Sequence, residues 1–276
     1  MNSQTRIAIL LATYNGEAFL REQIDSLYAQ TCKDWILYVH DDGSNDETPS
    51  ILKDYARKHD NIILLGYPSQ GGAKNNFLSM VDAVEADYYL LCDQDDKWFA
   101  EKIEKEMAKM AETERQHPGK PILIFSDLTV TDTRLKPVYD SMWEQAGIHP
   151  RTHMTFKREG TLEFVTGCTM LFNHQVKEAI VHPSNQATMH DAWITLCTLK
   201  SDGILCAIHE PLLYYRQHEG NTLGASYWSQ HSWGRKLLNI WRIICHDLSH
   251  WKMLKALNYG SFPKFLFYKY LYRRIK

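Results

Sequence analysis

The stretch Leu90-Leu91-Cys92-Asp93-Gln94-Asp95-Asp96 decides the fold class, because an apolar run here delivers three acids within four residues. Such a run predicts a strand buried on both faces, and in an open parallel sheet ligands bind at the carboxyl ends of the strands. Carboxylates this close repel one another unless a cation neutralises them, and oxygen ligands of this kind suit Mn²⁺ or Mg²⁺. The alternative is a solvated acidic turn that caps a helix at Lys97.

Strands alternate with helices on the N-terminal side of this stretch. The helices follow from apolar side chains at helical spacing after Phe19 and across two further segments, Glu47–Lys58 and Gly71–Ala86. The predicted strands are Ile7–Ala12, Trp35–His40, Asn61–Gly66 and Tyr88–Cys92. This alternation indicates right-handed βαβ units and a mostly parallel central sheet flanked by helices.

The second half of the chain adds elements with a less regular pattern. A helix is predicted over His190–Leu199, and strands are predicted over Pro121–Ser126, Phe164–Phe172, Ile204–Ile208 and Leu212–Arg216. Because no repeat or linker precedes about residue 225, we expect one composite domain followed by an extension.

Composition excludes several classes of protein. The 276 residues are 44% hydrophobic and 23% charged, and the net charge of −2 does not suggest a nucleic-acid partner. Six cysteines without a CxxC pair suit a reducing compartment. The apolar stretch at the N-terminus is too short for a signal peptide, and no run reaches the roughly 18 apolar residues of a membrane span. We therefore expect a cytoplasmic protein.

Polar residues follow three other predicted strands. They are Thr13-Tyr14-Asn15, the cluster Asp41-Asp42-Gly43-Ser44-Asn45-Asp46, and Gly71-Gly72-Ala73-Lys74-Asn75-Asn76. Glycine lets a ligand approach the backbone closely, and a helix N-terminus with a nearby lysine favours phosphate. Helix caps, a flexible turn and a surface cation are the ordinary alternatives. Convergence on one sheet edge favours a ligand site.

Residues 6–100 resemble the nucleotide-binding half of family 2 glycosyltransferases, which have the GT-A fold, a Rossmann-like α/β architecture. The matching pieces are Ala12–Gly16, Val39–Thr48, Gly71–Asn75 and Asp93–Asp96, in the same order and spacing. The resemblance implies a GT-A domain over residues 1–225. Its nucleotide-binding half covers about residues 1–115 and its acceptor half about 116–225, with a C-terminal helical extension over 226–276.

The resemblance also implies roles for residues of the first half. Asp42 is expected to hydrogen-bond the pyrimidine base, Asp93 to face the ribose and the metal, and Asp95 to ligate the metal. Lys74 stands where relatives often have Arg, and it can pair with phosphate as a point charge. The expected nucleotide-sugar-binding set is Thr13, Tyr14, Asn15, Asp42, Gly72, Lys74, Asn75, Asp93, Gln94 and Arg216.

The acceptor half has weaker counterparts in the family. Thr166–Met170 resembles the loop beneath the acceptor, and Met189–Trp193 resembles the segment that supplies the catalytic base. Asp191 is then the expected base, with a helix cap as its alternative. The expected acceptor contacts are Gly167, Cys168, His190 and Trp193.

The segment Tyr215-Arg216-Gln217-His218-Glu219-Gly220-Asn221 is similar to one in bacterial rhamnosyltransferase-like members of the family. The resemblance makes His218 a candidate third metal ligand beside Asp93 and Asp95, and a purely structural histidine is the alternative. Arg216 or Gln217 is expected to contact phosphate or sugar. The Gln-x-x-Arg-Trp motif of processive synthases is absent, which favours addition of a single sugar.

The C-terminal extension is basic and aromatic. Residues 251–276 hold seven Lys or Arg, no acid and eight aromatic residues, which leaves a net charge of −9 on residues 1–250. This composition suits the surface of an anionic membrane, so we expect peripheral contact with the inner face of the cell membrane. A helical cap on the domain and a homo-oligomer contact are the alternatives.

Together these features predict an inverting, metal-dependent glycosyltransferase of bacterial surface polysaccharide synthesis. It would transfer one sugar from dTDP-L-rhamnose or a UDP-sugar to a saccharide or lipid-linked acceptor. A non-catalytic sugar-nucleotide-binding or scaffold protein is one alternative. A nucleotidyltransferase is another, although the glycine-rich, Arg-containing loop of those enzymes is missing after the first strand.

Overall fold

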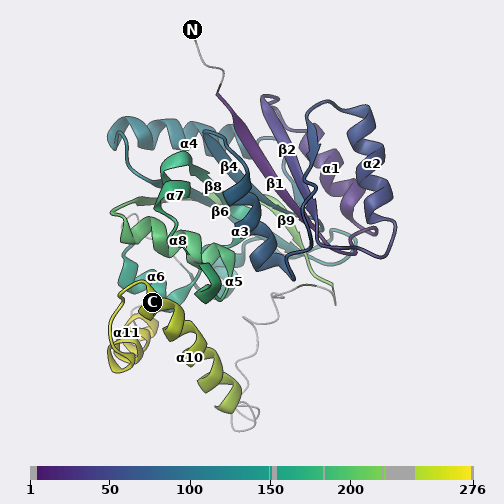
Figure 1. Cartoon of the computed structure of the whole chain (residues 1–276). Coiled ribbons are helices and arrows are strands. Elements are labelled where there is room, and N and C mark those ends of the chain that lie inside the picture. Colours follow the sequence, from purple (N-terminus) through teal and green to yellow (C-terminus); the bar gives the residue numbers. More distant parts are fainter. Residues whose placement is uncertain are drawn as a thin grey trace.

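The computed structural model describes residues 5–148, 150, 154–182, 184–218, 221 and 240–274 (Figure 1). In the first half, strands and helices alternate along the chain, as the apolar pattern predicts. The strands are β1 (Ile7–Thr13), β2 (Trp35–Asp41), β3 (Ile62–Leu64), β4 (Tyr88–Asp93) and β5 (Lys97–Trp98). The helices are α1 (Leu20–Tyr28), α2 (Thr48–Lys58), α3 (Ala73–Ala83) and α4 (Lys102–Gln116).

The second half is less regular. Its strands are β6 (Ile122–Thr131), β7 (Pro137–Tyr139), β8 (Met170–Asn173) and β9 (Ile204–Arg216). Its helices are α5 (Met142–Ala146), α6 (Phe156–Leu162), α7 (His174–Ala179), α8 (His190–Lys200), α10 (Ile240–Ala256) and α11 (Phe262–Arg274). Two short 3₁₀ helices are η1 (Gly167–Thr169) and η2 (Ser184–Gln186).

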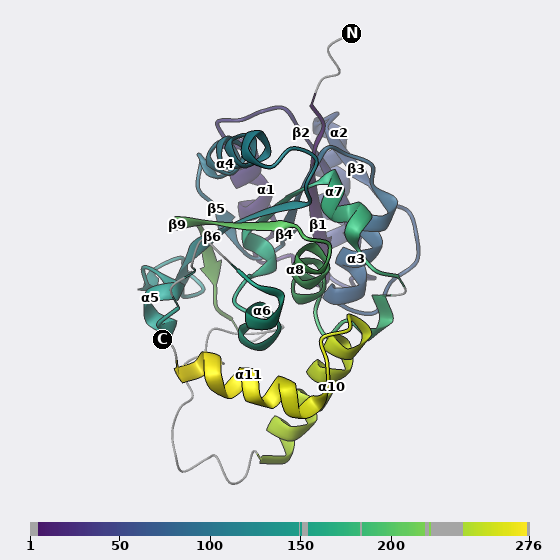
Figure 2. The same cartoon turned by 90° about the vertical axis from the view of Figure 1, so that its left-hand side faces the viewer.

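These strands form one sheet in the order β3-β2-β1-β4-β8-β6-β9-β5, with β7 paired to β6. Strands β3, β2, β1 and β4 run parallel, while β8 is antiparallel to both its neighbours. Figure 2 shows α3, α7 and α8 on one face of the sheet and α1 and α4 on the other. This arrangement buries the β1 side chains Ile9, Leu10 and Leu11 completely, which explains their continuous apolar run. It confirms the expected mostly parallel sheet flanked by helices, to which β8 adds antiparallel pairs.

The acidic turn after β4 does not cap a helix. Lys97 lies in β5 and pairs with Tyr214 of β9, and α4 begins only at Lys102, after Glu101. The helix-cap alternative for this turn is therefore wrong, because the chain forms a short strand before it turns into α4.

Two strand predictions in the second half are also corrected. Residues 164–172 do not form one strand, because η1 bends the chain and β8 begins only at Met170. The two short strands predicted after residue 203 are one long strand, β9, whose pairing with β6 shifts register where Asp127 meets Pro211. Proline lacks the N–H of a regular ladder, and the irregularity accommodates it.

Helices α10 and α11 confirm a helical C-terminal segment, but its expected beginning at residue 226 lies outside the described residues. Helix α11 packs against α6 below the sheet, as Figure 2 shows, and His250 of α10 contacts Gly160 O of α6. A Cβ added to Gly160 of α6 would lie 2.6 Å from the Tyr259 ring, so only glycine allows this close approach. Within the described part of the chain, no helix has both the length and the apolarity to cross a bilayer.

Candidate active site

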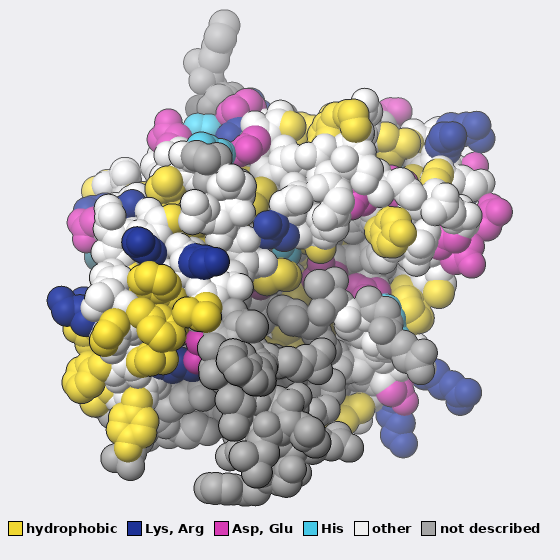
Figure 3. Space-filling view, turned by 60° about the horizontal axis from the view of Figure 1, so that its bottom comes forward, with side chains coloured by type: hydrophobic (Ala, Val, Ile, Leu, Met, Phe, Trp, Pro, Cys, Tyr) yellow, Lys and Arg dark blue, Asp and Glu magenta, His cyan; other side chains and the backbone are white. Residues whose placement is uncertain are grey.

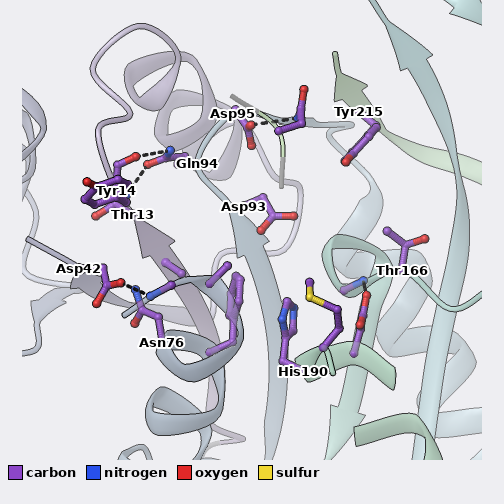
Figure 4. A pocket seen from close by; sticks show the side chains of 18 of the residues that line it. Thr13, Tyr14, Asp42, Asn76, Asp93, Gln94, Asp95, Thr166, His190 and Tyr215 are labelled. Carbon is purple, nitrogen blue, oxygen red and sulfur yellow. Dashed lines mark hydrogen bonds between the residues drawn. The ribbon is translucent and has the colours of Figure 1, made fainter. Parts of the chain in front are cut away.

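A cavity of about 720 Å³ lies at the carboxyl ends of β1 and β4 (Figure 4). This volume is in the range of small-molecule sites. The residues that we call the first wall come from the N-terminal half: Ala12, Thr13, Tyr14, Asp42, Gly43, Ser69, Gly71, Gly72, Ala73, Asn76 and Phe77. The second wall comes from the other half: Leu128, Met142, Glu163, Val165, Thr166, Gly167, Met189, His190, Asp191, Tyr215 and Asn221. Asp93, Gln94 and Asp95 lie between the two walls.

The acids after β4 form a cluster, the acidic rim, in which ionisation is unfavourable. Burial, together with the nearby charges of Asp95 and Asp191, raises the pKa of Asp93 to about 8. Burial also raises the pKa of Asp96 well above its ordinary value, with Asp95 and Asp93 as further causes. These carboxyl groups have raised pKa values because they are buried and close to other carboxylates. A divalent cation would stabilise their ionised form, so this set of oxygen donors fits Mn²⁺ or Mg²⁺.

The arrangement favours Asp93 and Asp95 as the metal ligands among these groups. One ligand atom each of Asp93, Asp96 and Cys168 lies within 4.8 Å of the others. However, burial keeps the Cys168 thiol protonated by raising its pKa, and a thiol suits a hard cation poorly. Asp93 and Asp95 both line the cavity, whereas Asp96 is completely buried.

His218 lies close to this rim without lining the cavity. Its Nε2 is 2.6 Å from Asp95 Oδ2, and the same oxygen accepts a longer, 3.4 Å hydrogen bond from Asn221 Nδ2. Its ring also packs on Phe19, with ring centroids 4.9 Å apart. The structure therefore brings His218 into contact with Asp95, one of the two expected carboxylate ligands.

Asp42 holds the glycine turn at the start of α3. Its carboxylate accepts hydrogen bonds from Ser69 Oγ at 2.8 Å and from the backbone N–H groups of residues 70, 71 and 72 at 2.5, 3.2 and 2.6 Å. Burial would raise the pKa of Asp42, but these four donors lower it below its ordinary value. Gly71 and Gly72 have φ of 76° and 110°, a backbone conformation that glycine adopts without strain. A base that binds Asp42 would have to replace some of these donors, since a carboxylate has about four acceptor positions.

Gln94 fixes the turn after β1. Its side-chain amide accepts from Tyr14 N and donates to Tyr14 O, both at 2.9 Å. Tyr14 itself is 54% exposed, and Figure 4 shows it beside Thr13 at the edge of the cavity. Asn15 is the exception in this turn, because its side chain accepts from Asn45 N and does not line the cavity.

Asp191 lies in the first turn of α8 and faces the cavity from the second wall. The residue before the helix is Met189, so the cap alternative for Asp191 is wrong. Its carboxylate accepts from Ala192 N at 2.7 Å and from Gly167 N at 3.2 Å. The result is a half-buried carboxylate with a fixed orientation, in the same cavity as Asp93.

His190 is packed behind this carboxylate as a neutral ring. Its ring lies on Phe77 with centroids 4.4 Å apart, and burial lowers its pKa even though Asp191 opposes the shift. A Cβ on Gly167 would stand 2.6 Å from His190 Nε2, so this position requires glycine.

Several residues expected at the site are elsewhere. Trp193 is completely buried and donates its indole N–H to Val181 O, so it cannot touch an acceptor. Arg216 is also buried, and its guanidinium donates hydrogen bonds to Asp95 O, Thr133 O and the Glu22 carboxylate. Cys168 lies beneath the rim.

Two residues of α3 that were expected to bind the nucleotide sugar also do not line the cavity. Lys74 Nζ donates to Ala187 O at 3.1 Å, and Asn75 is exposed and bonds to Gln70 O. The next residue, Asn76, lines the cavity instead and bonds to His40. Helical spacing could have found it, because Asn76 lies four residues before Met80 on the apolar side of the helix.

Glu163 is a cavity residue that sequence reasoning missed. It has φ of 43°, follows α6, and its carboxylate lies 2.9 Å from His250 Nδ1 of α10. The second ring nitrogen of His250 is 2.7 Å from Gly160 O. Because both nitrogens lie near acceptors, the contacts favour the protonated form of the ring, and they raise the pKa of His250 above its ordinary value. The sequence around Glu163 contains no local pattern that predicts its contact with His250.

Comparison with known families matches residues 8–180 to Glycosyl transferase family 2. The chain therefore belongs to the family 2 glycosyltransferases, enzymes that transfer a sugar from a nucleotide sugar. It is 27% identical to the dTDP-rhamnosyl transferase RfbG of Shigella flexneri over 229 residues, which are 78% of this chain and 74% of that protein. It is 30% identical to the putative glycosyltransferase EpsE of Bacillus subtilis over half of each chain.

Solved structures confirm the GT-A fold. S. aureus TarS in complex with UDP-GlcNAc superposes with a TM-score of 0.59 at 17% identity, covering 83% of this chain and 62% of that one. The mannosyltransferase PcManGT of Pyrobaculum calidifontis, in complex with GDP-Man and Mn²⁺, superposes with a TM-score of 0.59 at 14% identity. The match covers 98% of this chain and 70% of that one. At these identities the likeness concerns the fold alone.

Proposed function

We propose that this enzyme is an inverting, metal-dependent glycosyltransferase that moves one sugar to a saccharide or lipid-linked acceptor. The observation that carries the proposal is the meeting of two kinds of carboxylate in one cavity. Asp93 and Asp95 form a rim that fits a divalent cation, and Asp191 faces the same space from the opposite wall.

The first wall would bind the nucleotide, and the second wall would supply the catalytic base. On the first wall, Thr13, Tyr14 and Asp42 would hold the nucleoside, and the turn at Gly72 would approach the phosphates. Asp93 and Asp95 would hold Mn²⁺ or Mg²⁺, which supplies charge to offset the departing diphosphate. All of these residues line the cavity, whereas the guanidinium of Arg216 is already bonded within the protein.

Asp191 would be the general base. In an inverting transfer, one of its carboxylate oxygens takes the proton of the acceptor hydroxyl while the hydroxyl oxygen bonds to the anomeric carbon. The bond between this carbon and the diphosphate oxygen breaks with its electron pair going to the diphosphate. The hydrogen bond from Gly167 N would hold the carboxylate in position, and neutral His190 would border the acceptor space.

For the donor we propose dTDP-L-rhamnose, with a UDP-sugar as the second choice. The support is the similarity to RfbG, described as a dTDP-rhamnosyl transferase, over most of both chains. The reaction would serve bacterial surface polysaccharide synthesis in the cytoplasm. Residues 1–225 would form the catalytic domain and residues 226–276 the extension.

The test begins with donor binding. Thermal unfolding is measured with dTDP-L-rhamnose, UDP-sugars and GDP-mannose, each with Mn²⁺ and with EDTA, because a ligand of the native state raises Tm by mass action. We expect the largest rise with dTDP-L-rhamnose and Mn²⁺, and little rise with EDTA.

Turnover of the selected donor then tests the base. Asp191→Asn keeps an acceptor oxygen for one of the two backbone N–H donors but removes the basic carboxylate, so we expect kcat to fall by about 10²–10⁴-fold with unchanged donor binding. Asp34→Asn, which changes an exposed acid, is the matched control. Unchanged turnover in Asp191→Asn would reject this base, and donor binding without any turnover in the wild type would favour a non-catalytic binding protein.

A further inference from the structure

Helix α11 is apolar on two opposite sides. Its inner side packs on the domain, where Phe265 is completely buried beside His250 and Tyr259, with ring centroids 5.6 and 6.4 Å apart. Its outer side presents Leu266 and Phe267, which are 41% and 62% exposed. Tyr270, one turn further, is 58% exposed. Exposed apolar side chains that gather on one side of a helix are typical of an interaction site, so the outer side of α11 suits a partner.

The charges that α10 and α11 carry are mostly positive. Lys252, Lys255 and Lys264 are exposed, and Asp247 is the only acid in residues 240–276 of the sequence. Asp247 is neutralised by an ion pair with Lys269. Since residues 1–250 carry a net charge of −9, the basic character is confined to this end of the chain. The charge pattern therefore favours an anionic partner that this end alone would contact.

The apolar and basic side chains share one side of the molecule. Figure 3 shows hydrophobic side chains gathered over the region of α11, with Lys or Arg side chains next to them. In Figure 1, α10 and α11 lie at the same end of the molecule as the carboxyl ends of β1 and β4, where the cavity is. A flat partner on α11 would thus lie near the side of the enzyme that carries the cavity.

We propose that the outer face of α11, together with Lys252, Lys255 and Lys264, binds the surface of a membrane that contains anionic lipid. Aromatic side chains insert at the headgroup level, and lysine stems lie along apolar surface while their charges reach the phosphates. Each basic residue near such a surface strengthens binding by about fivefold, which corresponds to about 1 kcal/mol. This interaction goes beyond the proposed sugar transfer and does not depend on it.

The test uses the full chain and vesicle co-sedimentation. Vesicles of phosphatidylcholine alone are compared with vesicles of equal parts phosphatidylcholine and phosphatidylglycerol. We expect binding to the anionic vesicles that weakens as salt is added. Phe267→Glu should lower the partition constant by more than about tenfold, because it places a charge in the apolar contact. Val138→Glu is the matched control, since Val138 is 54% exposed on β7 and should leave binding unchanged.

A second pair of variants separates the charge contribution. Lys264→Glu should weaken binding by at least about fivefold, whereas Lys53→Glu, at an exposed position of α2, should not. Equal binding by Phe267→Glu and Val138→Glu, or no binding by the wild type, would overturn the proposal. Two further measurements test other partners for this face: light scattering detects a dimer, and homopolymer RNA binding detects a nucleic-acid site. A dimer that Phe267→Glu dissociates, or RNA binding that Lys264→Glu abolishes, in the absence of vesicle binding would assign this face to a second copy or to nucleic acid.

Discussion

The two walls of the cavity are built by different means. On the first wall, neighbouring turns at strand ends hold one another through short hydrogen bonds, as Asp42 holds the turn at Gly72 and Gln94 holds the backbone of Tyr14. On the second wall, side chains are positioned by packing between segments far apart in the sequence, as His190 is against Gly167 and Glu163 against His250. The position of the second wall therefore depends on tertiary packing much more than that of the first.

The largest effect is expected in the packing behind the second wall. Trp193→Ala should lower the free energy of unfolding by about 3–5 kcal/mol, because Trp193 is completely buried and its loss leaves a cavity in the core. Chemical denaturation measures this change. Trp193→Phe, which retains most of the ring volume, should lose much less.

Donor binding provides the contrast for this variant. At a temperature where Trp193→Ala is folded, its affinity for the nucleotide should match that of the wild type, because the first wall does not depend on Trp193. Weakened donor binding in folded Trp193→Ala protein would show that the first wall also depends on this packing.

A smaller effect is expected where α10 supports Glu163. Burial alone would lower the pKa of His250, but the Glu163 carboxylate and Gly160 O raise it above its ordinary value. Folding thus favours the protonated form of His250, and the stability that this contributes is fully present below pH of about 6.5. This stability is lost as the pH rises through the folded pKa. His250→Gln should therefore cost about 1.5–3 kcal/mol at low pH and less at high pH.

The measurement is Tm against pH for the wild type, His250→Gln and a control, His117→Gln, whose side chain is half-buried at the end of α4. The gap between wild type and His250→Gln should close as the pH rises. A gap that stays constant with pH would mean that His250 acts through its volume and not through its charge.

The same contrast explains what the sequence could predict. Strand ends and turn residues are local signals, so Asp42, Asp93 and Asp95 could be placed on one sheet edge from their spacing. Burial is not local, and for this reason Trp193 and Arg216 were expected at the ligand but lie in the interior. The ion pair between Glu163 and His250 joins residues 87 positions apart, and nothing in either segment encodes it alone.

The smallest effect compares one glycine from each half. A methyl group at Gly167 would stand 2.6 Å from His190 Nε2 and 3.6 Å from Asp191 Cβ. Gly167→Ala should thus cost about 1–3 kcal/mol of stability and displace the Asp191 carboxylate, lowering kcat while donor affinity stays unchanged. Gly66→Ala is the control from the first half, because nothing lies within 4 Å of its added methyl group and its φ is not positive. Alanine there should be neutral or stabilise by about 0.4–1 kcal/mol through the unfolded chain. If Gly167→Ala also left stability and kcat unchanged, the second wall would have room to adjust, and the contrast between the two walls would fail.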